Sequence, residues 1–118
     1  MVNNNRISAC LICVAALSFW IPASAAQPYD GQWRVTVTTL AGSCDRVTRH
    51  PLIINDGRIT GIDPTVSGKV NARGSVRVSM GSAFANGQLN KRAGSGKWNA
   101  ASGGVPCSGR WVATLVSR

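Results

Sequence analysis

The sequence has no glutamate, only four aspartates and a single histidine, His50. A glycosidase-type pair of carboxyl groups would have to be drawn from Asp30, Asp45, Asp56 and Asp63. Asp56 belongs to an Asp-Gly turn and Asp63 to an Asp-Pro loop, while the other two stand at the starts of expected strands. The scarcity of carboxylates therefore argues against this class of hydrolase.

A single histidine also limits nucleophilic, metal and haem chemistry. Zinc sites that need two histidines are excluded. A Ser–His–Asp set using His50 stays open, although no Gly-x-Ser-x-Gly elbow exists to present a serine. A haem would need His50, Met80 or Tyr29 as its axial ligand, and residues 27–118 contain no Cys-x-x-Cys-His motif. We predict no catalytic residue, no metal site and no cofactor, with His50 a partly exposed strand residue beside Pro51.

Long apolar runs are scarce too, and the one present lies at the N-terminus. Residues 7–21 are apolar apart from two serines, and they follow Arg6 and precede Pro22. Ala23-Ser24-Ala25 then has the small-x-small form of a signal peptidase site. The run of about 15 residues is shorter than the roughly 20 that span a bilayer. We predict a cleaved signal peptide over residues 1–26, a single periplasmic or secreted domain over 27–118, and no transmembrane segment after cleavage.

Cysteine is sparse once the signal peptide is removed. Cys10 and Cys13 lie inside that peptide, which leaves Cys44 and Cys107. Because exported proteins meet an oxidising compartment, we expect these two to form a disulfide. The loop that it closes has roughly 60 residues, which corresponds in the chain-entropy model to about 4 kcal/mol of stabilisation.

Positive charge is abundant, with 13 Lys and Arg residues against the four acids. A basic exported protein meets anionic lipids, polysaccharides or acidic proteins before nucleic acid, so we expect no nucleic-acid partner. The basic residues are scattered along the chain, which is compatible with a solvated, soluble surface. The alternative is an anion-binding face made of Arg73, Arg77, Lys91, Arg92, Lys97 and Arg110.

The remainder of the chain has the pattern of an all-β protein. Short alternating runs are separated by turn signals about every ten residues, and no window sustains a helical period. We expect eight strands at residues 31–40, 46–54, 58–62, 66–70, 75–80, 83–89, 95–100 and 108–116. Their tight links predict antiparallel neighbours in a small up-and-down β-barrel, closed so that no edge is exposed. In a barrel of this size we expect room for side chains and little room for a ligand.

A Gly-x-Trp triplet occurs three times, as Gly31-Gln32-Trp33, Gly96-Lys97-Trp98 and Gly109-Arg110-Trp111. The last two triplets face each other in the final hairpin. Trp33, Trp98 and Trp111 either fill the barrel or form an aromatic ligand surface, and the scarcity of phenylalanine favours the core. The small residues that alternate over 83–89 predict a slender strand face over which a bulky ring can lie.

The motifs Tyr29-Asp30-Gly31-Gln32-Trp33 and Gly42-Ser43-Cys44-Asp45, with the two later triplets and Cys107, resemble a family of small exported alphaproteobacterial proteins. The resemblance covers nearly all of residues 27–118 and consists of turns, tryptophans and the cysteine pair. Labels of haem utilisation or adhesion that some members carry find no residue-by-residue support here. The order of Gly-x-Trp and cysteine is also similar, loosely, to small periplasmic β-barrel protease inhibitors, without any inhibitory residue that carries over.

From these features we predict a monomeric, non-enzymatic binding or structural module. Its basic surface would engage an anionic cell-envelope component or another exported protein. One alternative is a protease inhibitor, which would present a protruding segment at residues 27–30 or a loop. Another is a haem or small-ligand carrier, which would require an open cavity.

Overall fold

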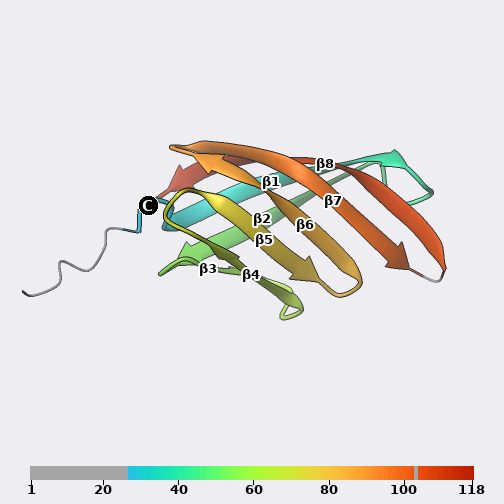
Figure 1. Ribbon diagram of the computed structural model, residues 1–118, viewed down its shortest axis with the longest axis horizontal. Helices are drawn as coiled ribbons and strands as arrows, with labels where there is room; N and C mark the ends of the chain where they lie inside the picture. The colour runs from blue at the N-terminus through green and yellow to red at the C-terminus, as the bar shows by residue number, and fades with distance from the viewer. Residues whose placement is uncertain (1–26, 103) are drawn as a thin grey trace, which may run out of the picture.

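The computed structural model describes residues 27–102 and 104–118, so the predicted signal peptide lies outside the described residues. The described chain consists of eight strands joined by short connections (Figure 1). The strands are β1 (Gly31–Ala41), β2 (Val47–Asn55), β3 (Arg58–Gly61), β4 (Val66–Val70), β5 (Ser75–Met80), β6 (Ala83–Asn90), β7 (Ala93–Ser102) and β8 (Val105–Ser117). The predicted all-β class and each expected strand are confirmed, and β7 and β8 extend beyond their expected ends.

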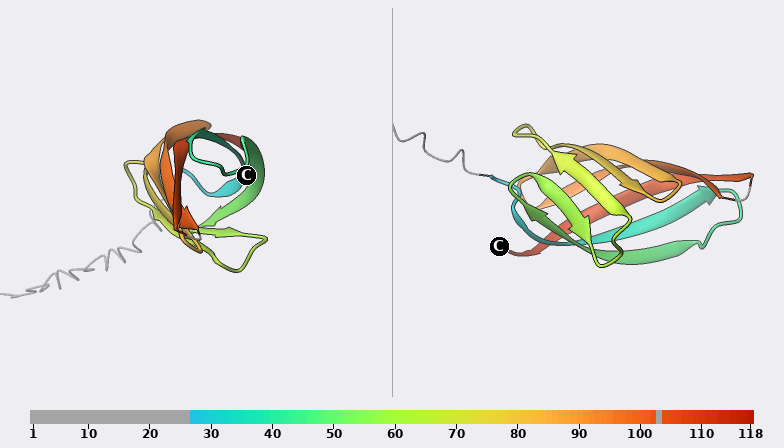
Figure 2. Two further views of the ribbon diagram at one scale, coloured as in Figure 1. Left: turned by 90° about the vertical axis from the view of Figure 1, so that its right-hand side faces the viewer. Right: turned by 90° about the horizontal axis from the view of Figure 1, so that it is seen from below.

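The strands form one closed antiparallel barrel in sequence order, with β1 paired to β8 (Figure 2). A row of directly paired residues that starts at Asn55 in β2 runs round the wall and returns to β2 at Val47. The shear of the barrel, which is the offset along β2 between the two ends of this row, is therefore eight residues (55 − 47 = 8) for eight strands. Barrels of this size have strands tilted by roughly 35–45° and a lumen that side chains usually just fill.

The wall is uneven in its pairing. The seam between β3 and β4 has only two directly paired positions, Arg58 with Lys69 and Ile59 with Gly68. β2 pairs with β3 only from Leu52 onward, so the preceding Pro51 lies where β2 has no partner on that side. A proline fits there because it has no N–H to donate.

The core follows from strict alternation along the strands. On β8, Trp111, Ala113 and Leu115 are buried while Val112 is 54% exposed. The buried residues gather towards the end of the barrel that carries Gln27, the C-terminus and the β2–β3 turn. They are Trp33, Val35, Ile54, Ile59, Val70, Val76, Leu89, Trp111, Ala113 and Leu115, with Tyr29 packed against them. We call this end the closed end.

Residues 27–30 lie against the closed end and do not protrude. The Asp30 carboxylate accepts hydrogen bonds from the backbone N–H of Asp56, at 2.9 Å, and from that of the next residue, at 3.3 Å. Gln27 donates from Nε2 to the Asp56 carboxylate, and the Trp33 indole N–H donates to the Tyr29 carbonyl at 2.8 Å. The protruding segment that the protease-inhibitor alternative places here is therefore wrong, because hydrogen bonds and the Tyr29 ring hold these residues on the barrel.

Replacing Asp30 with alanine is expected to lower the free energy of unfolding by about 1–2 kcal/mol, because two N–H donors lose a charged acceptor. Asp45→Ala removes the same charge from the β1–β2 loop, where the Asp45 backbone carbonyl, not its carboxylate, accepts the hydrogen bond from Thr39. Urea unfolding of both variants would measure the difference. Equal losses would contradict the anchoring role of Asp30.

Candidate functional site

The two Gly-x-Trp triplets of the last hairpin cross-pair. Gly96 in β7 lies directly opposite Trp111 in β8, and Trp98 lies directly opposite Gly109. A methyl group built on Gly96 would lie 2.7 Å from Cε2 of Trp111, and one on Gly109 would lie 2.9 Å from Nε1 of Trp98. Each indole therefore occupies the space above the glycine of the other triplet. Glycine is needed at both positions for a second reason, because an added methyl group would overlap a backbone carbonyl oxygen, that of Asn86 at Gly96 and that of Thr38 at Gly109.

Hydrogen bonds fix both rings across the inner wall. The Trp98 N–H donates to the Thr38 carbonyl, and the Trp111 N–H donates to the Asn86 carbonyl, each at 3.1 Å. A methyl group on Gly87 would also run into the Trp111 ring, so this ring lies over the slender face of β6 as predicted. Because both N–H groups have partners, the rings can line an apolar space without an unsatisfied donor.

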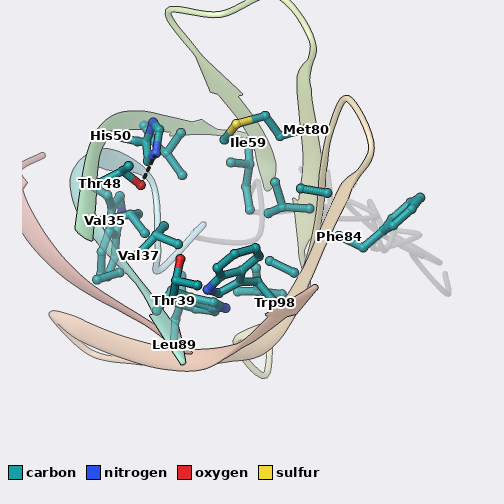
Figure 3. Close-up of a pocket in the computed structure, with 18 of the residues that line it drawn as sticks. Val35, Val37, Thr39, Thr48, His50, Ile59, Met80, Phe84, Leu89 and Trp98 are labelled. Carbon is teal, nitrogen blue, oxygen red and sulfur yellow. Dashed lines mark hydrogen bonds between the residues drawn. The ribbon is translucent and has the colours of Figure 1, made fainter. Parts of the chain in front are cut away.

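A cavity of about 280 Å³ remains inside the barrel (Figure 3). Two small inward residues of β6, Ala83 and Ala85, line it, whereas the space over Gly87, Gly94 and Gly96 is taken by the side chains of Trp111 and Leu89. The expectation of little room for a ligand is therefore wrong. The number and length of the strands predicted a filled lumen, whereas the free volume also depends on the small side chains of Ala83 and Ala85.

The cavity is apolar in its depth and polar on one side of its outer part. Its walls include Trp33, Val35, Val37, Leu52, Ile54, Ile59, Val76, Val78, Ala85, Leu89, Trp98, Trp111 and Ala113. It extends away from the closed end to Asp45 in the β1–β2 loop and to Met80 and Ala83 beside the β5–β6 turn. We call this end the mouth.

Polar side chains of the cavity gather on β1 and β2 near the mouth. His50 and Thr48 both point inward, and His50 Nε2 lies 3.0 Å from the Thr48 hydroxyl (Figure 3). The Thr39 hydroxyl donates to the Asp45 carbonyl at 2.6 Å. His50 is half-buried, as predicted for a partly exposed strand residue, and it shares the inner face with Leu52 and Ile54. The pair formed by His50 and Thr48 can exchange hydrogen bonds with one polar group of a molecule in the cavity.

The disulfide lies beside the mouth. Cys44 is bonded to Cys107, with 6.0 Å between their Cα atoms, so the predicted bridge is confirmed. It ties the β1–β2 loop to β8, and the half-buried Cys44 also lines the cavity. Gly42 has a φ of +94° and passes so close to the bridge that an added methyl group would lie 2.8 Å from the Cys107 sulfur. The loop that borders the cavity is therefore held covalently.

Trp33, Trp98 and Trp111 were expected either to fill the core or to form an aromatic ligand surface. Trp33 and Trp111 are buried, as expected for the core, at 2% and 6% exposure. Trp98 is only half-buried and projects into the lumen (Figure 3). All three line the cavity, so the core residues and the potential ligand surface are the same rings.

The predicted anion-binding residues fall into two groups. Arg77, Lys97 and Arg110 belong to one row of directly paired positions on the outer wall, in which Asn86 stands between Arg77 and Lys97. The other three lie at the closed end, Arg73 in the β4–β5 turn and Lys91 and Arg92 in the β6–β7 turn. Two further members of the row, Arg58 and Lys69, were missed, because strand register across β3, β4 and β5 cannot be read from one strand at a time.

Other chemistry at the site is limited. Among the residues described, no group of three or more His, Cys, Asp or Glu side chains is placed to hold a metal ion.

Away from the cavity, Asp63 lies in the β3–β4 loop. Hydrogen bonds from the backbone N–H and then the hydroxyl of Thr65 lower the pKa of its carboxyl. In the described part of the chain there is also no helix with the length and apolar character needed to cross a membrane.

Comparison with known proteins returned no matching family model and no matching curated protein. The resemblance to small exported alphaproteobacterial proteins therefore stays a prediction from the quoted motifs.

Proposed function

We propose that this protein is a non-enzymatic carrier that binds a small, mainly apolar molecule inside its barrel. The observation that supports this function is the cavity of about 280 Å³, walled by aliphatic side chains and three indole rings. An apolar pocket with a few convergent polar groups is the feature that small-molecule sites share. Of the functions expected from the sequence, the small-ligand carrier is the one that required such a space.

The cavity volume limits the ligand. An apolar cavity of about 150 Å³ accommodates benzene, so a space nearly twice as large suits a molecule of roughly eleven non-hydrogen atoms. A haem macrocycle is far larger, which favours a small aromatic or short aliphatic compound over haem. At usual ligand efficiencies a molecule of this size binds with a dissociation constant on the order of 1–100 µM.

The polar residues near the mouth indicate how the ligand is oriented. The apolar part would lie against Trp33 and Trp111 in the depth of the cavity. A hydroxyl or similar group would face Thr48 and His50, where hydrogen bonds are available. An alcohol or phenol fits this arrangement better than a plain hydrocarbon.

Binding of 1-naphthol, which has eleven non-hydrogen atoms and one hydroxyl, tests the proposal by isothermal titration calorimetry. We expect saturable binding with a negative heat-capacity change, because apolar surface is buried. Ala85→Leu should weaken binding at least tenfold, since Ala85 lines the cavity between Val78 and Trp98. Ala93→Leu, the same substitution at an exposed position of β7, is the control and should leave affinity unchanged.

Two results would refute the carrier function. One is the absence of saturable binding of 1-naphthol to the folded wild-type domain. The other is an Ala85→Leu variant that stays folded and binds as tightly as the control. With its predicted export signal, the carrier would work in the periplasm or outside the cell.

A further inference from the structure

A continuous row of positive charge crosses most of the outer wall. Directly paired positions on β3 to β8 carry, in order, Arg58, Lys69, Arg77, Asn86, Lys97 and Arg110. All six side chains are exposed, and five are cations. We call this row the basic belt. It lies on the opposite side of the wall from the cavity and is a separate surface.

The belt is unfavourable for the isolated barrel. Like charges directly opposite each other on neighbouring strands are destabilising, and the belt has three such pairs: Arg58 with Lys69, Lys69 with Arg77, and Lys97 with Arg110. Strands β3 to β8 contain no acidic residue, because all four aspartates lie in the lead-in or the connections. The repulsion within the sheet is thus uncompensated by the sheet itself. A bound polyanion would remove it.

The shape of the belt selects the kind of polyanion. Five strand-to-strand steps of about 4.8 Å give a length of roughly 24 Å at the backbone. They also cover about five eighths of the circuit of the eight-stranded wall, on a path inclined to the barrel axis by the strand tilt. A flat membrane surface touches only a short arc of such a wall. A flexible linear polymer can follow the whole belt.

A surface groove of about 400 Å³ at one end of the belt indicates the chemistry of that polymer. Lys97 and Arg110 line it together with the amide side chains of Asn86 and Asn99. Phe84, which is 61% exposed and points away from the lumen, also lines the groove (Figure 3). Cations pair with carboxylates, amides hydrogen-bond to hydroxyls, and an exposed aromatic ring stacks on the apolar face of a sugar ring.

We infer that the basic belt binds a flexible acidic polysaccharide, with one uronic-acid-type sugar seated in the groove beside Phe84. The inference goes beyond the carrier function and does not depend on it. It assigns the predicted anion-binding role to Arg77, Lys97 and Arg110, adds Arg58 and Lys69, and leaves out the cations of the closed-end turns.

Binding of polygalacturonate, measured by biolayer interferometry at low and at physiological salt, tests the inference. Wild-type protein should bind, and more weakly as salt rises. Lys97→Gln/Arg110→Gln should lose at least tenfold in affinity. The control Lys91→Gln/Arg92→Gln removes the same charge from the β6–β7 turn and should lose less than threefold. Phe84→Ala should weaken binding of polygalacturonate without changing its salt dependence. Unchanged 1-naphthol binding would show that the two double variants are folded. For Phe84→Ala the folding control is an unchanged melting temperature, because Phe84 also lines the outer part of the cavity.

Other probes separate this partner from competing ones. Polyglutamate and vesicles rich in phosphatidylglycerol carry comparable negative charge without sugar rings. Weaker binding of both than of polygalacturonate would support the polysaccharide. Equal losses in the two double variants, equal or tighter binding of polyglutamate or of the vesicles, or no binding of polygalacturonate at low salt would each overturn it.

Discussion

Removal of the disulfide by the double substitution Cys44→Ala/Cys107→Ala is expected to lower the free energy of unfolding by about 4 kcal/mol, within a usual range of 2–5 kcal/mol. The two cysteines are 63 residues apart in sequence, so the bridge removes much of the freedom of the unfolded chain. Small domains have a net stability of only about 5–15 kcal/mol, which makes this a large fraction. The variant should unfold at a much lower urea concentration than the oxidised wild type.

The reduced wild-type protein is the control for this experiment, because it keeps both sulfur atoms in place. If the bridge itself is responsible, the reduced protein and the double variant should unfold at similar urea concentrations. If the reduced protein remained as stable as the oxidised one, the loss in the variant would come from the packing of Cys107, which is 2% exposed, and not from the bridge.

Gly96→Ala is expected to have an effect of similar size, about 3 kcal/mol or more. An added methyl group at Gly96 would overlap the Asn86 carbonyl and lie 2.7 Å from both the Gly87 Cα and Cε2 of Trp111. Two of these three obstacles are backbone, which cannot turn aside as a flexible side chain can. Overpacking of a tight core typically costs about 1–3 kcal/mol, and an obstacle made of backbone belongs at or above the upper end.

Gly81→Ala is the control for Gly96→Ala, because it adds a methyl group that strains the backbone without crowding any neighbouring atom. Gly81 has a φ of +57° in the β5–β6 turn, and nothing lies within 4 Å of an added methyl group. The substitution should therefore cost only about 1 kcal/mol, from the left-handed conformation. Urea unfolding of both variants gives the comparison. A Gly96→Ala variant as stable as Gly81→Ala would contradict the close packing of the crossed triplets.

Local sequence signals were sufficient to predict the strands and turns. Asp56 and Gly57 have φ values of 53° and 72°, as the predicted Asp-Gly hairpin turn requires. Short alternating runs separated by turn signals located all eight strands within a few residues of their observed bounds. These features depend on residues close together in the chain, which one sequence reports directly.

The cavity and the basic belt could not be predicted in the same way. Whether the lumen is filled depends on the summed volume of inward side chains from all eight strands, including Ala83 and Ala85. The alignment of Arg58 and Lys69 with Arg77 depends on register across successive strands. A shift of two residues at either pairing would separate the cations without changing any strand's own pattern. Both features are properties of the closed circuit and not of any one segment.

A closed barrel with one short strand pairing is expected to open first at that pairing. The β3–β4 seam is held by only two directly paired positions, whereas β7 and β8 pair over ten. When thermal fluctuations open the cylinder, they should therefore open it there, and the two strand borders released would be free to pair with those of another copy. The resistance of this barrel to strand exchange is therefore set by the short β3–β4 ladder and not by the long β7–β8 ladder.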